Sequence, residues 1–265
     1  MSSGIKRLAA AAVVMPVFIA YVYYLPAFPY FLGLIIAAGM IAMRELFNMY
    51  RIPAGLNASA VAAGGLLLYL FCQYPEYALH GIFLAMAALI LHRMFWEEGP
   101  SGSISDLGPV GIGFLYIAVC MSFHWSLREL ENGLAYTFAL YFSVWLADSM
   151  AYYVGSYMGR HKLCPKISPG KTVEGAIGSV LGGISGIMLA KVIFDISSIS
   201  FLCAGATGVV MGLTTLTGDL IESNFKRDAG VKDSGRLMPG HGGIFDRIDG
   251  LLVSGPVLYF LVRFF

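Results

Sequence analysis

Residues 172–194 read TVEGAIGSVLGGISGIMLAKVIF, and this stretch decides the fold that we expect. It is long enough to cross a membrane, since about 20 residues of helix span the hydrocarbon core. Lipid offers no partners to backbone N–H and C=O groups, so the segment should form a helix, which satisfies them internally. Gly178, Gly182 and Gly186 recur at four-residue spacing, which lets helices approach closely in lipid. We interpret the glycines as packing within the chain, with a dimer interface as the alternative.

The composition of the whole chain is that of an integral membrane protein. Of its 265 residues, 58% are hydrophobic and 12% are charged, and the mean hydropathy is +0.74. Soluble domains carry about twice that share of charged residues, about 25%. The four cysteines show no C-x-x-C spacing, so we expect neither a disulfide framework nor a zinc site. We also expect no nucleic-acid partner.

Long apolar runs predict an all-α, polytopic membrane protein with about nine transmembrane helices. The expected spans are residues 7–27, 30–50, 56–73, 77–95, 108–127, 132–156, 172–194, 199–223 and 247–265. The first run exceeds the about 7–15 apolar residues of a signal peptide and no A-x-A site follows, so we expect it to be retained as a span.

The chain divides by its chemistry into two regions. Residues 1–127 form an N-terminal transmembrane scaffold with little unusual charge. Residues 128–265 form a C-terminal transmembrane region in which acidic residues collect, with loops expected at 157–171 and 224–246. We expect the chemistry of the protein in this second region.

The basic residues predict the orientation, because Lys and Arg are retained on the cytoplasmic side of a membrane. With a cytoplasmic N-terminus, all of the 17 Lys and Arg except Arg128, Lys191 and Arg263 fall in cytoplasmic segments. We therefore expect a cytoplasmic N-terminus and an external C-terminus.

Acidic residues gather at the expected cytoplasmic ends of three helices. Asp148 lies late in one helix, Asp219 and Glu222 lie late in another, and Asp246 and Asp249 begin the last. A carboxylate at the edge of hydrocarbon is costly, so it usually faces a partner or a polar cavity. Interfacial salt bridges with neighbouring Lys and Arg are one interpretation. The other, which the three helix ends favour, is a site for a hard cation such as Mg²⁺, which takes carboxylate oxygens.

The connection between the last two helices, DAGVKDSGRLMPGHGG at residues 228–243, has the composition of an anion site. Its five glycines let backbone N–H groups approach an anion, and Lys232 and Arg236 supply positive charge. Ser223 and Lys226 precede it on the helix face that carries Asp219. His241 is open to two interpretations, a structural or phosphate-contacting role and a general base.

Two stretches together resemble a known family. Residues 223–249 follow the pattern S-x-x-K-R-x-x-x-x-K-D-x-x-x-x-x-P-G-H-G-G-x-x-D-R-x-D, and residues 147–175 carry an aspartate at a helix end followed by Ser-Pro-x-Lys-Thr. The chain resembles the phosphatidate cytidylyltransferases, or CDP-diacylglycerol synthases, over residues 140–265. Residues 1–127 resemble them only in hydropathy.

The resemblance implies transfer of the cytidylyl group of CTP to phosphatidate, giving CDP-diacylglycerol and pyrophosphate. It implies Mg²⁺ held by Asp219 and Asp246, with Asp249 and Asp148 either as further ligands or as residues that support the ligands, and leaves open a second metal ion. The implied catalytic residues are Asp219, Lys226, Arg227, Asp246 and Asp249, and the implied substrate-binding residues are Ser223, Lys171, Lys232, Arg236, His241, Gly242 and Gly243. We also expect a homodimer among membrane lipids, in a bacterial plasma (inner) membrane, with the site facing the cytoplasm.

Two rival functions predict different residue patterns. The CDP-alcohol phosphotransferases also use clustered aspartates, but their Asp-Gly-x-x-Ala-Arg pattern does not occur in this chain. A polytopic ion or metabolite transporter would line a pathway with Asp148, Asp219 and Glu222. Against the transporter, the acids are expected at one membrane face, and an odd number of spans does not suit paired inverted repeats.

Overall fold

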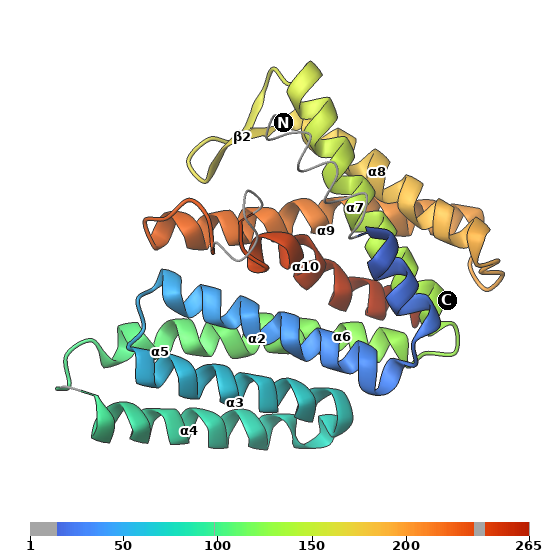
Figure 1. Ribbon diagram of the computed structural model, residues 1–265. Helices are drawn as coiled ribbons and strands as arrows, with labels where there is room; N and C mark the ends of the chain where they lie inside the picture. The colour runs from blue at the N-terminus through green and yellow to red at the C-terminus, as the bar shows by residue number, and fades with distance from the viewer. Residues whose placement is uncertain (1–14, 98, 236–241, 265) are drawn as a thin grey trace. The chain divides into compact units, whose positions relative to one another are not determined.

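The computed structural model describes residues 15–97, 99–235 and 242–264, shown in Figure 1. The chain forms two compact units, one of Met1–Trp125 with Asp233–Asp246 and one of Ser126–Lys232 with Arg247–Phe265. The segment Asp233–Asp246 thus belongs with the first unit. The expected division into residues 1–127 and 128–265 stays a prediction.

The first unit consists of helices joined by short turns. In chain order they are Met15–Tyr24, η1 (Ala27–Phe31) leading into α2 (Leu32–Met49), α3 (Ala54–Gln73), η2 (Pro75–Tyr77) leading into α4 (Ala78–Trp96), and the consecutive α5 (Ser103–Ile112), η3 (Gly113–Ala118) and α6 (Val119–Arg128), whose last residues belong to the second unit. Pro53 directly precedes α3, and Pro75 is the first residue of η2. The N–H that proline lacks would have no partner within the helix at such positions, so its absence costs nothing.

The core of the first unit lies where α2, α3 and η3 meet. Figure 1 shows α2, α3 and α4 side by side, and contacts join α2 to α3, α3 to α4, and η3 to both α2 and α3. Met43, Leu56 and Phe114 are fully buried there. Gly64 of α3 leaves space for Met43, since a Cβ at this glycine would lie 2.5 Å from the sulfur of Met43.

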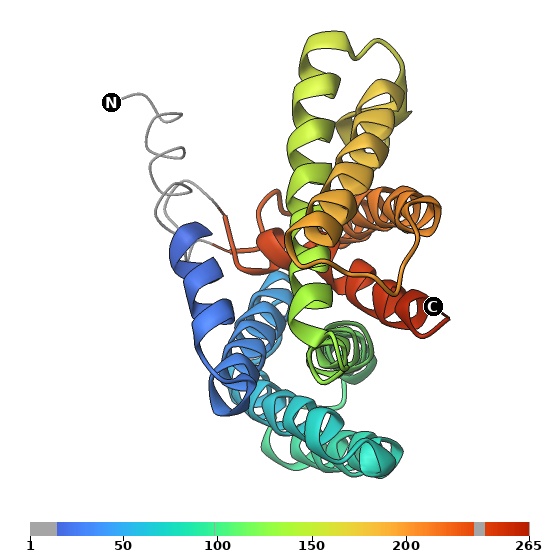
Figure 2. The same cartoon turned by 90° about the vertical axis from the view of Figure 1, so that its right-hand side faces the viewer.

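The second unit is built around three long helices and a hairpin. Its elements are α7 (Gly133–Met158), β1 (Lys162–Cys164), β2 (Ser168–Thr172), α8 (Val173–Ile193), α9 (Phe201–Asp228) and α10 (Phe245–Val262), of which the first two residues belong to the first unit. Figure 2 shows α8 running beside α7, and α8 also packs along α9.

Glycines bring α8 close to both of its neighbours. A Cβ on Gly182 would collide with the backbone carbonyl of Leu146 on α7. On another face of α8, Gly183 lies against the backbone of Gly212 on α9, and Ser179 Oγ donates a hydrogen bond to the carbonyl of Gly212 at 2.9 Å. These contacts support the interpretation of the glycine spacing as packing within the chain.

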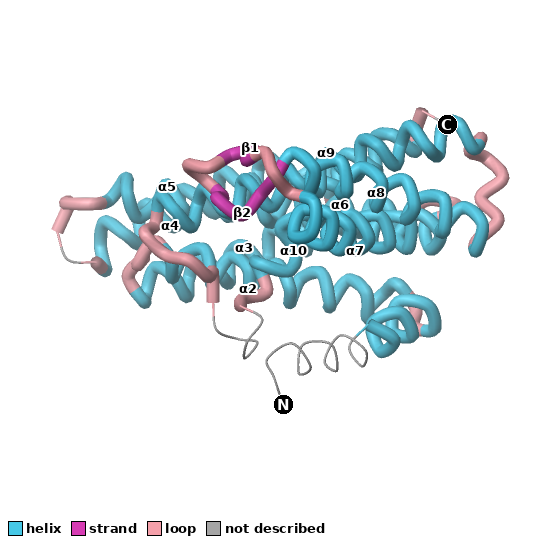
Figure 3. Tube along the Cα trace, turned by 90° about the horizontal axis from the view of Figure 1, so that it is seen from above, coloured by secondary structure: helices cyan, strands magenta, loops and turns pink. Residues whose placement is uncertain are grey.

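The hairpin of β1 and β2 is an addition to the all-helical expectation (Figure 3). The strands pair antiparallel, with Lys162 opposite Thr172, and Lys162 Nζ donates to the carbonyl of Pro169 at 2.8 Å. They lie within the segment 157–171 that was expected to be a loop. A two-stranded ribbon this short leaves little trace in hydropathy, because its residues alternate over only three to five positions.

Helix α9 runs to Asp228, past its expected end at residue 223. The extension is stabilised by the i, i+4 ion pair of Glu222 with Lys226. Lys226 and Arg227 in the last turn also complement the negative end of the helix dipole. The final turn of α9 is therefore held by charge, which an apolar pattern does not reveal.

Within the described residues, six helices are long and apolar enough to cross a membrane. They are Ala27–Met49, Ala54–Gln73, Pro75–Trp96, Ser103–Arg128, Val173–Ile193 and Phe201–Asp228. The expected all-helical, polytopic membrane protein is thus confirmed in its general form. Helices α7 and α10 coincide with the expected spans 132–156 and 247–265 but are not among the six. The count of nine spans and the orientation of the termini stay predictions.

The glycine contact between α7 and α8 gives a test of this packing. We expect Gly182→Ala to lower the thermal unfolding temperature of the detergent-solubilised protein, since overpacking costs about 1–3 kcal/mol. Gly205→Ala is the matched control, because a Cβ at Gly205 meets only the Cε of Met188 at 3.5 Å. Alanine is the better helix former, so the control should be neutral or stabilised. Equal unfolding temperatures for the two variants would contradict the packing.

Candidate active site

Three carboxylates from two helices meet in the second unit. Asp219 and Glu222 lie one turn apart on α9, and Asp249 lies near the start of α10. Each offers one oxygen, and these three atoms lie within 4.8 Å of one another. Glu222 is only 1% exposed, whereas Asp219 and Asp249 are partly exposed. The group therefore combines one deeply buried acid with two that are partly exposed.

The approach of α9 to α10 depends on a glycine beside the first acid. A Cβ built on Gly218 would collide with the carbonyl oxygen of Asp249, so a larger residue would require the backbone to shift. Farther along the same contact, the hydroxyls of Thr214 and Ser254 are hydrogen-bonded at 2.9 Å. The contact at Gly218 places the next residue, Asp219, beside Asp249.

Two lysines pair with acids of this group. Lys171 of β2 forms an ion pair with Asp219, and Lys226 Nζ lies 2.5 Å from Oε2 of Glu222. Burial lowers the pKa of Lys171, and the nearby carboxylates of Asp148 and Asp249 oppose this shift. Burial therefore outweighs the acids in the pKa of Lys171, although the acids favour its positive charge.

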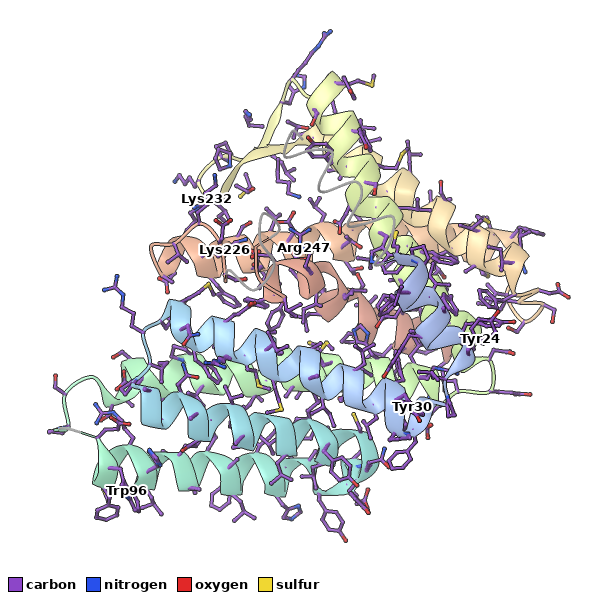
Figure 4. The ribbon with its side chains drawn as sticks, viewed as in Figure 1. Tyr24, Tyr30, Trp96, Lys226, Lys232 and Arg247 are labelled. Atoms are coloured by element: carbon purple, nitrogen blue, oxygen red, sulfur yellow. The ribbon has the colours of Figure 1, made fainter. Side chains whose placement is uncertain are left out.

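The cluster extends to α7 and to the start of α10. Asp148 of α7 is exposed and interacts electrostatically with Lys171 and with Arg247, which is itself exposed. Figure 4 labels Lys226 on α9 and Arg247 on α10. The cluster joins four acids, Asp148, Asp219, Glu222 and Asp249, with three cations, Lys171, Lys226 and Arg247. Fully ionised, it has one negative charge in excess.

The hairpin fixes the position of Lys171. The next residue, Thr172, is the N-cap of α8, and its Oγ1 accepts a hydrogen bond from the N–H of Gly175 at 3.0 Å. In the turn before β2, the carbonyl of Ile167 accepts a hydrogen bond from Arg227 Nε at 3.2 Å. The hairpin is thus bound both to the start of α8 and to the end of α9, and Lys171 lies between these attachments in the chain.

Two further predicted site residues, Ser223 and Lys232, are described by the structure. The buried Ser223 donates its hydroxyl to Oδ1 of Asp219 at 3.3 Å. Lys232 is exposed on the loop after α9 (Figure 4). Arg236 and His241 lie outside the described residues.

Asp246 has its own contacts within the first unit. Its Oδ2 accepts hydrogen bonds from the N–H of Ser234 at 3.2 Å, from the hydroxyl of Ser234 at 2.8 Å and from the N–H of Gly243 at 2.7 Å. Gly242 has φ +79°, a conformation that favours glycine. In the described residues Asp246 therefore acts as a hydrogen-bond acceptor at the start of α10. The close group of three carboxylates contains Asp249 but does not include Asp246.

Two acids were missed as site residues by sequence reasoning. Glu222 was recognised on the acidic face of its helix but was not chosen, although its i, i+3 spacing from Asp219 was a usable signal. Glu45 of α2 was not considered. It is 7% exposed and accepts hydrogen bonds from the N–H groups of Ile244 at 3.1 Å and Phe245 at 2.8 Å. A lone acid near the end of an apolar helix was its only signal.

The fold and the cluster define a polytopic, helical membrane protein with a charged site suited to anionic substrates and a cation. The chain matches the cytidylyltransferase family over residues 5–265 and belongs to that family, so it is a nucleotidyltransferase. It is 34% identical over 235 residues to a phosphatidate cytidylyltransferase of Staphylococcus aureus (strain COL), covering 84% of this chain and 86% of the relative. It is 33% identical over 244 residues to the phosphatidate cytidylyltransferase of Bacillus subtilis (strain 168), covering 88% of each.

The buried ion pair of Glu222 and Lys226 gives a test of the cluster. We expect Glu222→Gln to lower the unfolding temperature in detergent without divalent cations, since breaking a buried pair from one side costs about 3 kcal/mol or more. Adding Lys226→Gln should recover part of the loss, because the ammonium group that lost its partner is then also removed. The exposed Glu131→Gln serves as the control. A double variant less stable than Glu222→Gln alone would contradict the pairing.

Proposed function

We propose that this protein transfers the cytidylyl group of CTP to phosphatidate, with CDP-diacylglycerol and pyrophosphate as products. The observation that carries the proposal is the paired cluster of Asp219, Glu222, Asp249, Lys171 and Lys226 in a membrane protein of the cytidylyltransferase family. Its relatives named phosphatidate cytidylyltransferase support the choice of lipid substrate. The site also suits a reaction between a soluble nucleotide and a phospholipid.

The chemistry requires little proton transfer and much charge neutralisation. A phosphate oxygen of phosphatidate attacks the α-phosphorus of CTP and forms a new P–O bond. The bond from the α-phosphorus to the oxygen bridging it to the β-phosphorus breaks, and pyrophosphate leaves with the electron pair. A phosphomonoester is already ionised at neutral pH, so catalysis rests on positioning and electrostatic stabilisation of two anions.

The lysines of the cluster are suited to hold phosphate oxygens. Lys171 and Lys226 each pair with a carboxylate, and an ammonium group offers three donors, so either can contact a phosphate while it keeps an acid neighbour. We propose that Lys171 and Lys226 hold the triphosphate, with Arg227 and Lys232 adding positive charge nearby. Ser223 orients Asp219 through its hydroxyl.

The acids fit a hard divalent cation. Mg²⁺ takes oxygen ligands at near-octahedral positions, commonly one or two carboxylates with substrate phosphates and waters. We propose Asp219 and Asp249 as its ligands, with Glu222 and Asp148 supporting them. When bound, the ion neutralises charge on the phosphates. The metal role of Asp246 and the presence of a second ion stay predictions.

We further propose that the site faces the cytoplasm of a bacterial plasma membrane, where CTP is present. The distribution of Lys and Arg supports this orientation. The homodimer also stays a proposal, and it rests on the family resemblance, because the glycines of α8 are occupied by contacts to α7 and α9. Native mass spectrometry of the protein in detergent tests the oligomeric state.

The reaction itself is tested with purified protein in detergent–phosphatidate micelles. We expect α-³²P-labelled CTP and Mg²⁺ to give a labelled lipid that migrates as CDP-diacylglycerol, with release of one pyrophosphate per lipid. Replacing phosphatidate by diacylglycerol, which lacks the attacking phosphate, should abolish the product. No labelled lipid under any divalent cation would refute the proposal, and ion flux in vesicles would then favour a transporter.

The metal site is tested by removing one charge at a time. Asp249→Asn should weaken Mn²⁺ binding, followed by the electron paramagnetic resonance signal of free Mn²⁺, by at least about tenfold, and reduce lipid product at least as much. Asp195→Asn is the matched control, because Asp195 is exposed in the loop after α8 and outside the cluster. Equal Mn²⁺ affinities in the two variants would contradict the ligand role of Asp249.

Asp246→Asn in the labelled-CTP assay tests the predicted metal role of Asp246 separately. If Asp246 is a ligand, we expect this variant to stay folded in detergent and to lose formation of the labelled lipid. Full activity at unchanged Mg²⁺ dependence would refute it.

A further inference from the structure

Glu45 is a buried carboxylate on α2 in the first unit, and it is the only acid of that mainly apolar helix, in which the polar residues Arg44 and Asn48 are exposed. A charge buried at such a place is costly unless hydrogen bonds satisfy it. Its neighbours Leu46 and Phe47 are fully buried. The side chain must therefore have partners that compensate for the lost water.

The partners are backbone N–H groups at the start of α10. Oε1 of Glu45 accepts from Ile244 at 3.1 Å, and Oε2 accepts from Phe245 at 2.8 Å. The first N–H groups of a helix have no partner within it, and a negative charge there is stabilised by the helix dipole. Glu45 thus caps α10 from a helix about 200 residues earlier in the chain.

Ser234 links Glu45 to Asp246. Its hydroxyl lies 2.8 Å from Oδ2 of Asp246 and 3.4 Å from Oε2 of Glu45. A hydroxyl has one proton to donate, so the shorter contact to Asp246 is the hydrogen bond. Asp246 also accepts from the N–H groups of Ser234 and Gly243. The carboxylates of Glu45 and Asp246 therefore both accept hydrogen bonds from the backbone at residues 243–245, and Ser234 lies near both of them.

Two glycines lie close against the carboxylate of Glu45. A Cβ on Gly235 would lie 2.5 Å from Oε1 of Glu45, and one on Gly243 would collide with Oε2 of Glu45 and with Oγ of Ser234. Glycine at both positions lets the backbone close around the carboxylate. This steric fit is independent of the hydrogen bonds and supports the same arrangement.

We propose that Glu45 is a positioning residue for the cytidylyl transfer. It fixes the first turn of α10 and the orientation of Asp246, and α10 is also the helix that carries Asp249. This inference rests on the proposed function, because it matters to catalysis only if these aspartates serve the reaction. A residue of the N-terminal region thereby acts through the last helix of the chain without touching substrate.

The test compares Glu45→Gln and Glu45→Ala with Glu76→Gln, a matched change at an exposed position. Per folded molecule, we expect kcat to fall about 10–100-fold in Glu45→Ala and less in Glu45→Gln, which keeps one acceptor oxygen. KM for CTP should stay within about threefold of wild type, since the lysines of the second unit are unchanged. A lower unfolding temperature with unchanged kcat would show a structural role only and overturn the proposal.

Hydrogen exchange followed by mass spectrometry tests the cap directly. Its wild-type measurement does not depend on whether the variant folds. In the wild type, the amides of Ile244 and Phe245 should be protected, and in Glu45→Ala they should exchange at least about tenfold faster. Unprotected amides in the wild type would overturn the proposal. A wild type that makes no labelled lipid would instead refute the proposed function, whereas an active wild type with fully active Glu45 variants would refute this inference alone.

Discussion

The ion pair of Lys171 with Asp219 is the interaction on which the rest of the charged cluster depends. Carboxylates at the edge of a membrane are costly when they stand alone, and four of them repel one another. Lys171 joins the hairpin to α9, and Asp148 and Asp249 both act on its charge. Lys226 likewise forms an ion pair with the buried Glu222. The acids can lie together because the cations are fixed among them by the hairpin and by the last turn of α9.

This concentration of charge requires close packing of the helices around it. Gly218 lets α9 touch the backbone of Asp249, and the glycines of α8 let that helix approach α7 and α9. Lipid tails are as apolar as the side chains, so there is no hydrophobic driving force between helices in a membrane. Helices there associate through close van der Waals packing and through hydrogen bonds such as that of Ser179 to Gly212. The same packing that holds the second unit together therefore sets the spacing of the charged groups that we propose for catalysis.

The chemistry proposed for the cluster follows from its charge balance. With one negative charge in excess, the cluster attracts a divalent cation, and its lysines remain available to phosphate oxygens once that cation shares the carboxylates. Phosphatidate and CTP bring further negative charge, which a poorly solvated site would otherwise exclude. Glu45 adds a different kind of control, since it acts on the backbone at the start of α10 and on no substrate group.

Hydropathy was enough to predict a helical membrane protein, because lipid forces each long apolar run into a helix. The positions of the acids singled out Asp219 and Asp249, and the family resemblance implied roles for Lys171 and Lys226. These signals did not reveal the hairpin or the added turn of α9, because strand pairing and a charged helix end leave no apolar pattern. They also did not reveal that Asp233–Asp246 belongs to the first unit, because this follows from contacts with residues far away in the chain. The sequence determined which residues are chemically unusual. Only the tertiary structure decided that Glu222 joins Asp219 and Asp249, that Asp246 bonds to Ser234 and Gly243, and that Glu45 caps α10. The physical reason is that contacts between different elements and loops, up to about 200 residues apart for Glu45, leave no periodic pattern in the chain.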